Sequence, residues 1–163
     1  MGAIDDATSE VTGATFREHE DAAGYLEVLA QTSRSHGLAW TFYTDRHGIF
    51  ERDPREPPTI AEQLEGRRTP TQVGRALAVA GIGWMPAGSP EAKGRVERMW
   101  GTHQDRLVTE LRLAGITTIA GANAFLPGYL ARHNERFRVP AADPTPAWRP
   151  WPAGLTAEAV FAF

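Results

Sequence analysis

The chain contains no cysteine among its 163 residues, so disulfide bonds and thiolate metal sites are excluded. It also has no apolar run of the roughly 20 residues that a membrane-spanning helix needs. The first ten residues, MGAIDDATSE, are acidic where a secretory signal is basic, and Asp6 occupies the position where a myristoylation motif has serine or threonine. We therefore expect a cytoplasmic protein that does not bind membranes.

Acidic and basic residues are unevenly distributed along the chain. Residues 1–66 carry 5 basic and 13 acidic side chains, a balance of −8, whereas residues 67–140 carry 11 basic and 5 acidic ones, a balance of +6. Arginine supplies most of this positive charge, and its guanidinium group suits phosphate oxygens. The second half is therefore a candidate phosphate-facing surface, with a solvated helix face as the alternative explanation.

Hydrophobic periodicity and turn residues predict an α/β protein with a mixed sheet. In chain order, the expected elements are strands over 2–6 and 11–16, a helix over 20–35, a strand over 38–44, a polar excursion over 51–69, a helix over 71–80, a strand over 82–85, a long helix over 90–113, a helix within 117–137, a proline-rich linker over 140–156 and a strand-like fragment over 159–163. The segment 38–44 is apolar on both faces, so we expect it to be central in the sheet.

The stretch FYTDRHG places a carboxylate directly after that expected central strand. Asp45 follows the strand, and Arg46, His47 and Gly48 come next. One interpretation is an ordinary turn, because Asp-x-x-Gly is common where strands end. The other is a functional carboxylate at the edge of a sheet, with two basic side chains beside a negatively charged substrate.

A second carboxylate lies on the long expected helix. One side of this helix is apolar and should face the sheet. The residues of that stripe are Val96, Met99, Trp100, His103, Leu107 and Leu111. Glu97 lies on another face, with Gly94 and Gly101 about one turn to either side. Glycine destabilises a helix by roughly 0.5–1 kcal/mol relative to alanine. Two glycines beside one glutamate therefore suggest that this face lacks side chains so that a large ligand can approach the carboxylate. A solvated glutamate paired with Lys93 is the alternative.

Together, Asp45 and Glu97 predict a metal site. Hard cations such as Mg²⁺ take oxygen ligands and keep waters that substrate phosphates can replace. Two such ions about 3.5–4 Å apart activate the attacking oxygen and stabilise the leaving one in phosphodiester displacement. An aspartate at a strand end and a glutamate on a packed helix would suit this chemistry.

The segments YTDRHGIF and SPEAKGRVERMWGTHQDRL resemble the catalytic core of DDE transposases and retroviral integrases, most closely the ISNCY-type insertion-sequence transposases of bacteria. The resemblance continues through IDDATSEVTGATF, LRLAGITTIAGANAFL, YLARHNERF and PAADPTPAWRP, and so covers nearly the whole chain. It implies an RNase H-like mixed sheet flanked by helices. The implied activity is metal-dependent cleavage and strand transfer at transposon ends, with Mg²⁺ or Mn²⁺ as cofactor.

The resemblance also assigns individual residues. Asp45 matches the second catalytic acid and Glu97 the third. Lys93 and Arg95 match basic positions beside that glutamate that face DNA, and the resemblance implies DNA contacts for these two, Arg98, Arg46 and His47. His47 is equally compatible with a local structural hydrogen bond. The implied partners are transposon-end and target DNA and further copies of the same protein, acting in the cytoplasm on the nucleoid.

The sequence departs from the family pattern at its beginning and end. The family's first catalytic aspartate lies on a first, central strand, and the chain starts at what matches the second strand. Asp5 and Asp6 match family acids without a catalytic role. We therefore expect an N-terminally truncated core over 1–139, the linker over 140–156 and the start of a C-terminal β-barrel over 157–163. Such a fragment should be inactive alone, and should either leave a gap in the sheet or pair residues 2–6 with 38–44.

Two other functions fit the same residues. A catalytically inactive remnant could bind DNA, or a full-length transposase, through the arginine-rich helix. A nuclease could share the fold, but the resemblance extends beyond the acids into the linker, which favours a transposase.

Overall fold

The computed structural model describes residues 1–44, 48–50, 52, 55–86, 90–145 and 147–162, with the backbone alone for 90–93 and 95. Its strands are β1 (Gly2–Ile4), β2 (Val11–Ala14), β3 (Leu38–Ala39), β4 (Thr41–Thr44), β5 (Gly83–Pro86) and β6 (Trp148–Arg149). Its helices are α1 (Ala22–His36), α2 (Ile60–Glu65), α3 (Gln72–Ala80), α4 (Pro90–Leu113), α5 (Ile119–Phe137) and α6 (Ala157–Val160). The expected α/β class is confirmed. No helix in these ranges combines the length and apolar character needed to cross a bilayer.

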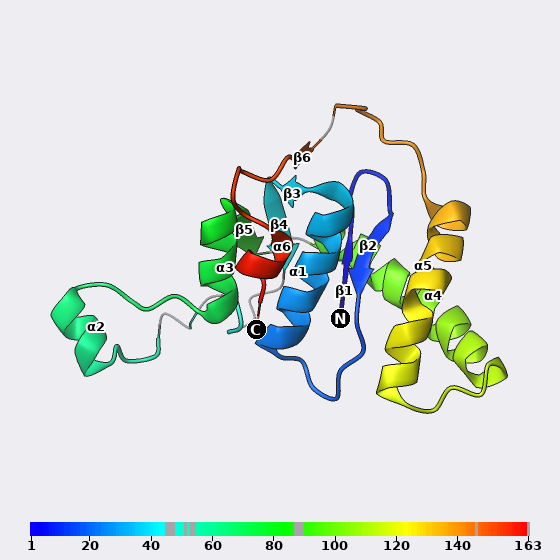
Figure 1. Cartoon of the computed structure of the whole chain (residues 1–163), viewed down its shortest axis with the longest axis horizontal. Helices are drawn as coiled ribbons and strands as arrows, with labels where there is room; N and C mark the ends of the chain where they lie inside the picture. Colours follow the sequence, from blue (N-terminus) through cyan, green and yellow to red (C-terminus); the bar gives the residue numbers. More distant parts are fainter. Residues whose placement is uncertain (45–47, 51, 53–54, 87–89, 146, 163) are drawn as a thin grey trace.

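The antiparallel hairpin β1–β2 lies between two helical layers. Figure 1 shows α1 on one side of the hairpin and the α4–α5 pair on the other. The contact with α1 is close: a Cβ atom added at Gly13 would lie 2.9 Å from the carbonyl oxygen of Val28. Because real Cβ atoms do not approach that closely, glycine at position 13 allows α1 to pack directly on β2.

The second pair of strands, β4 and β5, is parallel and packs on the main hydrophobic core. Phe42 and Trp84 point toward this core, and the Phe50 ring stacks on Trp84 at a centroid distance of 6.1 Å. The buried residues of the core come from α1, α3, α6 and the segments beside them, and include Leu26, Leu29, Leu38, Val73, Leu77, Ile82 and Phe161. Helix α1 therefore packs against the β1–β2 hairpin and also lines the core on which β4 and β5 pack.

The segment 38–44 differs from the single buried strand that we expected. It divides at Trp40 into β3, which pairs with β6, and β4, which pairs with β5. Trp40 and Tyr43 are both 60% exposed. The apolar residues on the second face of this segment therefore mark a solvent-facing surface. Apolar composition does not by itself say whether another layer covers a strand.

In the described part of the chain, no backbone pairing joins β1–β2 to β4–β5. Residues 2–4 pair with β2 alone, so they do not take a place beside 41–44. The sequence led us to expect either a gap in the sheet or pairing of residues 2–6 with 38–44. In the described residues the two pairs of strands are separate, and this pairing is not formed. The RNase H-like strand order remains a prediction.

The end of the chain folds back onto the core, and the strand expected at 159–163 is wrong. Residues 157–160 instead form α6, because the Thr156 hydroxyl accepts a hydrogen bond from Ala159 N and caps a helix. Ala157 and Phe161 are buried in the main core, and Trp151 donates a hydrogen bond to Ser33 O. The expected linker also contains β6. The division into core, linker and barrel remains a prediction.

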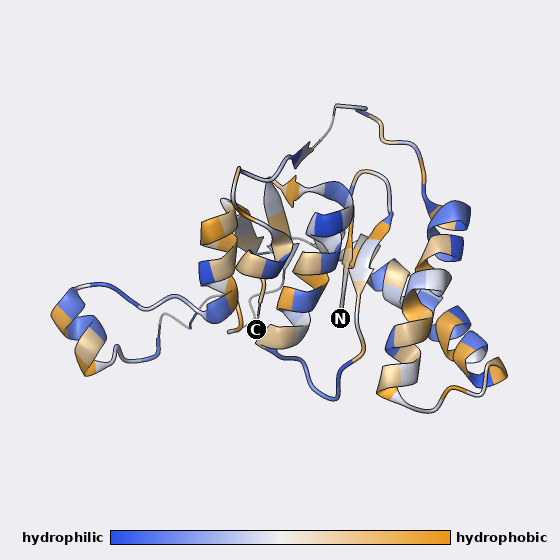
Figure 2. Cartoon of the chain, viewed as in Figure 1, coloured by the Kyte–Doolittle hydropathy of each residue, from blue (hydrophilic) through white to orange (hydrophobic). Residues whose placement is uncertain are grey.

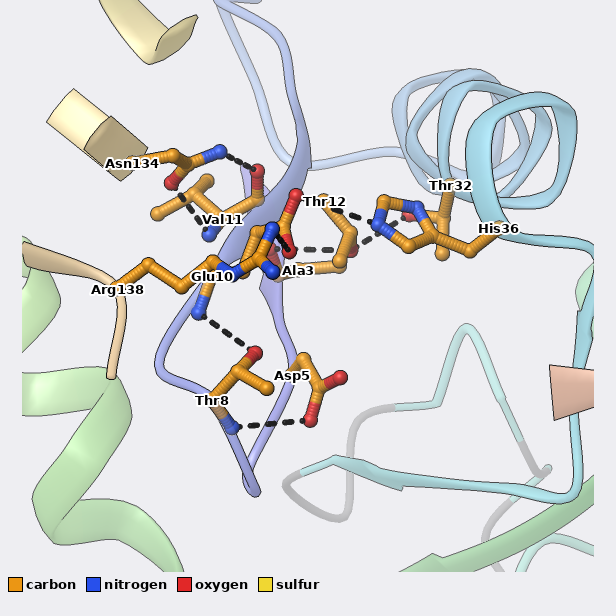
Figure 3. A network of polar contacts seen from close by, with 10 residues as sticks. All are labelled: Ala3, Asp5, Thr8, Glu10, Val11, Thr12, Thr32, His36, Asn134 and Arg138. Carbon is orange, nitrogen blue, oxygen red and sulfur yellow. Dashed lines mark hydrogen bonds and ion pairs between the residues drawn. The ribbon is translucent and has the colours of Figure 1, made fainter. Parts of the chain in front are cut away.

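Two asparagines on α5 seal the outer edge of the hairpin. Asn134 Oδ1 accepts from Val11 N and its Nδ2 donates to Val11 O, both at 2.9 Å (Figure 3). Asn123 makes the same pair of bonds with Phe16, at 2.7 and 3.0 Å. Each side-chain amide thus replaces a neighbouring strand. Asn123 and Asn134 are eleven residues apart on α5, and their partners Phe16 and Val11 are five residues apart along the extended chain. Both separations correspond to about 16.5 Å, so the two contacts can form at the same time.

Candidate catalytic site at the ends of β4 and β5

The strand that precedes Asp45 in the sequence, β4, ends beside β5, the strand that precedes α4. The two strands are parallel and in register, with Thr44 opposite Pro86. The Trp84 indole N–H also donates a hydrogen bond to Thr44 Oγ1, which ties the last residue of β4 to β5. Asp45, Arg46 and His47 follow Thr44 in sequence and lie outside the described residues. Their predicted roles are therefore neither confirmed nor contradicted.

Glu97 lies on α4, which begins at Pro90, four residues after β5 ends. Seven residues of helix carry Glu97 about 10 Å along the axis from the start of α4. The Glu97 side chain is exposed, as is that of Arg98. Among the described side chains, none forms an ion pair with Glu97. The side chains of Lys93 and Arg95 are not described.

The glycines beside Glu97 leave space on its side of the helix. Among the described residues, a Cβ atom added at Gly101 would meet no heavy atom within 4 Å, and one at Gly94 would meet Arg98 Nη1 at 3.8 Å. Glycine at these positions is therefore not required for packing within the described part of the molecule. This openness fits the prediction that a bulky ligand approaches here.

The apolar stripe of α4 packs as the sequence predicts. Met99, His103 and Leu107 are buried, and Leu107 joins Ala14 of β2 in a second hydrophobic cluster. The ring of Trp100, 36% exposed, would lie 3.4 Å from a Cβ atom at Gly2. Helix α4 is thus fixed to the hairpin, and its glycine-flanked face is directed elsewhere.

A buried polar cluster joins α4 to α5. His103 Nδ1 lies 3.0 Å from the Tyr129 hydroxyl, and the His103 and His133 ring centroids are 4.6 Å apart. Burial lowers the pKa of His103 to about 4, and the nearby His133 contributes to this shift. Burial and the charge of Arg106 also lower the pKa of His133. Both rings are therefore neutral at pH 7.

Sequence reasoning missed this cluster. It placed His103 on the apolar stripe but assigned no role to Tyr129 or His133. The available signal was their four-residue spacing on the next helix, which puts both on one face.

Asp5 has a structural role in the turn of the hairpin. Its Oδ1 accepts hydrogen bonds from Ala7 N at 2.8 Å and Thr8 N at 3.4 Å. Ser9 adopts a left-handed backbone conformation with φ of 61°, and its N–H donates to Asp5 O. The carboxylate therefore stabilises the turn, in agreement with the prediction that Asp5 is not a catalytic acid. Figure 3 shows this turn beside the contact of Asn134 with β2.

Within the described residues, no three His, Asp or Glu side chains gather closely enough to hold a metal ion. Asp45 lies outside that search, so the predicted pairing of Asp45 with Glu97 stays open.

The structure therefore defines a class of protein. It is an α/β protein in which a parallel pair of strands precedes a long helix that carries an exposed carboxylate. Two curated proteins are similar to this chain. One is named "Putative transposase y4bF", from Sinorhizobium fredii, 39% identical over 147 residues, which are 90% of this chain and 31% of that protein. The other is the transposase for insertion sequence IS1202 of Streptococcus pneumoniae, 36% identical over 135 residues, which are 83% of this chain and 28% of that protein.

Both of these relatives are named as transposases, in agreement with the resemblance that the sequence shows. The chain spans about a third of the length of these curated relatives. No protein-family model and no solved structure matches it.

Proposed function

We propose that this chain is the catalytic core region of a DDE-type transposase. In this proposal, Asp45 and Glu97 hold Mg²⁺ or Mn²⁺ for phosphodiester cleavage and strand transfer at transposon ends. The in-register parallel pair β4–β5 is the observation that carries the proposal. It brings Thr44 and Pro86, the last residues of the strands that precede Asp45 and α4 in the sequence, to the same edge of the sheet.

The described side chains fit a divalent cation. Glu97 offers an exposed carboxylate with no described ion-pair partner, and carboxylate oxygens are the ligands that Mg²⁺ prefers. When bound, the cations would polarise the scissile phosphate and activate the attacking hydroxyl. Arg98, with Lys93, Arg95, Arg46 and His47, would hold the negatively charged DNA against this edge. The glycine-flanked face of α4 gives the DNA backbone room to approach.

The family's first catalytic aspartate has no counterpart at the described part of this site, since Asp5 serves the hairpin turn. We therefore expect this chain alone to bind metal and DNA without cleaving DNA efficiently. Binding is for that reason the more informative measurement.

Metal binding tests the site directly. Electron paramagnetic resonance of added Mn²⁺ should show a bound ion that Glu97→Gln weakens more than about tenfold, because a neutral amide is a poor ligand for a hard cation. Asp45→Asn should have the same effect. Asp105→Asn is the matched control, because Asp105 is an exposed acid two turns further along α4 and should leave binding unchanged. Equal Mn²⁺ affinity in wild type and Glu97→Gln would refute the metal site.

DNA binding separates the enzyme from the second candidate, a DNA-binding remnant. If Arg98 contacts a phosphate, Arg98→Ala should weaken binding of a labelled duplex and reduce the slope of log affinity against log salt by about 1. Fluorescence anisotropy at several salt concentrations measures this, with Arg112→Ala, near the end of α4, as control. DNA binding in a protein that binds no Mn²⁺ would favour the remnant.

A further inference from the structure

Two arginine side chains contact one aromatic ring where α4 meets the end of α5. The guanidinium carbon of Arg106, on α4, lies 5.0 Å from the centroid of the Phe137 ring. That of Arg136, on α5, lies 5.6 Å from the same centroid. Distances of this size are typical of cation–π contacts. Figure 2 shows that the last turns of α5 are largely hydrophilic, and both arginines are exposed. The ring therefore holds two positive charges near each other at the surface.

Neither Arg106 nor Arg136 forms an ion pair with a described side chain. The acids that precede them in sequence, Asp105 and Glu135, are exposed. Neighbouring residues on a helix point about 100° apart, so these acids are directed away from the arginines that follow them. Two like charges that are close together without a counter-charge repel each other. An anion that binds between them would relieve this repulsion.

Other arginines of the same helix pair are already neutralised. Arg132 donates a hydrogen bond of 2.6 Å to Glu110, and Arg138 donates one of 3.3 Å to Glu10. Glu110 is four residues beyond Arg106, a spacing that allows an ion pair on a helix, yet it binds Arg132. Acidic residues on α4 and β2 thus serve other arginines, and the two at the Phe137 ring stay accessible to an external ligand.

The contact with the ring suits these arginines to phosphate. Arginine stacks on an aromatic ring through its planar face, which leaves the N–H groups at its edge able to donate. Those N–H groups form paired hydrogen bonds with phosphate oxygens. Because the ring restricts each side chain before binding, less conformational entropy is lost when the anion arrives.

This pair of arginines is separate from the candidate metal site. Arg106 follows Glu97 by nine residues, which places it on the opposite side of α4 and about 13.5 Å further along the helix axis. A phosphate at the metal site cannot reach it. The ligand here is therefore a different phosphate from the one that would react.

We propose that Arg106 and Arg136 form a second DNA-binding site, which holds the phosphate backbone of a DNA segment other than the one at the metal site. The inference rests on the proposed function, because that function makes DNA the source of the phosphate groups. Helix α4 then contacts DNA on two sides, through Arg98 beside Glu97 and through Arg106 beside α5.

Fluorescence anisotropy of a labelled duplex tests the contact. The variant Arg106→Ala with Arg136→Ala should weaken binding at least tenfold and reduce the slope of log affinity against log salt by about 2. The control variant Arg75→Ala with Arg112→Ala removes the same charge from two exposed arginines elsewhere and should leave the slope unchanged. All four positions are exposed, so folding should be preserved, as circular dichroism can verify. An unchanged slope in the first variant would overturn the proposal.

Lysine substitution separates charge from geometry. The variant Arg106→Lys with Arg136→Lys keeps both charges but lacks the planar fork. It should retain the salt slope of the wild type and bind the duplex more weakly. Affinity equal to that of the double alanine variant, with the same reduced slope, would contradict a phosphate contact at these positions.

The titration of His133 provides a second measurement. Burial and the charge of Arg106 lower its pKa, and His103 and Tyr129 are the titratable rings that contact it. A phosphate bound at Arg106 would offset the effect of that charge, so the pKa of His133 should rise when the duplex is added. Nuclear magnetic resonance of the histidine ring protons measures this rise. An equal rise in Arg106→Ala would overturn the proposal.

This inference and the metal site can fail separately. Mn²⁺ affinity should be the same in wild type and in Arg106→Ala with Arg136→Ala. A wild type that binds no Mn²⁺ would refute the metal site, while the changes in salt slope would still support the second DNA contact. A wild type that binds no duplex would overturn the contact. So would equally tight binding of polyglutamate, since that result would assign the two arginines to an acidic protein.

Discussion

Lowering the pH from 7 to 4 is expected to remove about 3 kcal/mol of folding stability through His103 alone. The pKa of this buried ring falls from 6.5 to about 4 on folding. Between these two values the unfolded chain binds more protons than the folded one, so stability rises with pH. The contribution is complete above about pH 6.5 and is lost as the pH falls toward 4. A difference of about 2.5 pH units corresponds to about 3 kcal/mol.

The environment of the cluster explains why protonation is unfavourable. His103 Nε2 and His133 Nδ1 are buried without a hydrogen-bond partner in the described part of the chain, so a new N–H would lack an acceptor there. His133 is also adjacent, and two charged imidazoles 4.6 Å apart would repel each other. Acid should therefore loosen the packing of α4, which carries Glu97, against α5.

Urea unfolding at several pH values measures this effect. His103→Gln should flatten the dependence of unfolding free energy on pH between 6.5 and 4, whereas His19→Gln should leave it unchanged, because His19 is exposed. Carboxylate titration adds a background that all three proteins share. If wild type and His103→Gln lose stability equally over this range, His103 is not the group responsible.

Replacement of both edge-sealing asparagines, Asn123→Ala with Asn134→Ala, is expected to cost about 4 kcal/mol. Each asparagine makes two hydrogen bonds to β2 or to the residues that follow it. A lost hydrogen bond costs roughly 0.5–1.5 kcal/mol, and a buried backbone group left unpaired costs more. Val11 is only 3% exposed, so water cannot readily replace its partner. The sites are about 16.5 Å apart, and their effects should therefore add.

Thermal unfolding should show this loss as a decrease in Tm of roughly 10 °C in the double variant. Each single variant should show about half of it. Glu135→Ala is a suitable control, because this neighbour of Asn134 is exposed. The double variant should also aggregate more readily, since an uncovered edge strand can pair with another chain. A decrease below about 2 °C would show that the asparagines do not stabilise this edge.

The positions of the main helices followed from sequence, because capping residues and apolar periodicity are local signals. Asp21, Thr71 and Thr118 cap helices within two residues of the expected starts. The final segment, Ala159 to Phe163, was misassigned, since five apolar residues suit a strand or a buried helix equally. The Thr156 cap and the burial of Phe161 decided that question, and the burial depends on residues far away in the sequence.

At the candidate site, sequence supplied the carboxylates of Asp45 and Glu97 and the glycines beside the latter. The structure added the parallel register that brings the ends of β4 and β5 to one edge, which local patterns do not encode. Tertiary structure also decided which apolar side chains are buried and which are exposed. Tyr43 resembles a core residue by composition, yet it faces solvent in this chain.

The sequence by itself determined the α/β class and the order of the principal elements, and it predicted which residues hold a metal ion, because these depend on side-chain chemistry and short-range periodicity. Only the tertiary structure decided that 38–44 divides between two partners, that Asn123 and Asn134 replace a neighbouring strand, and that His103 meets Tyr129 and His133 in a buried cluster. Each of these joins residues distant in the chain, and such contacts form when packing brings whole elements together.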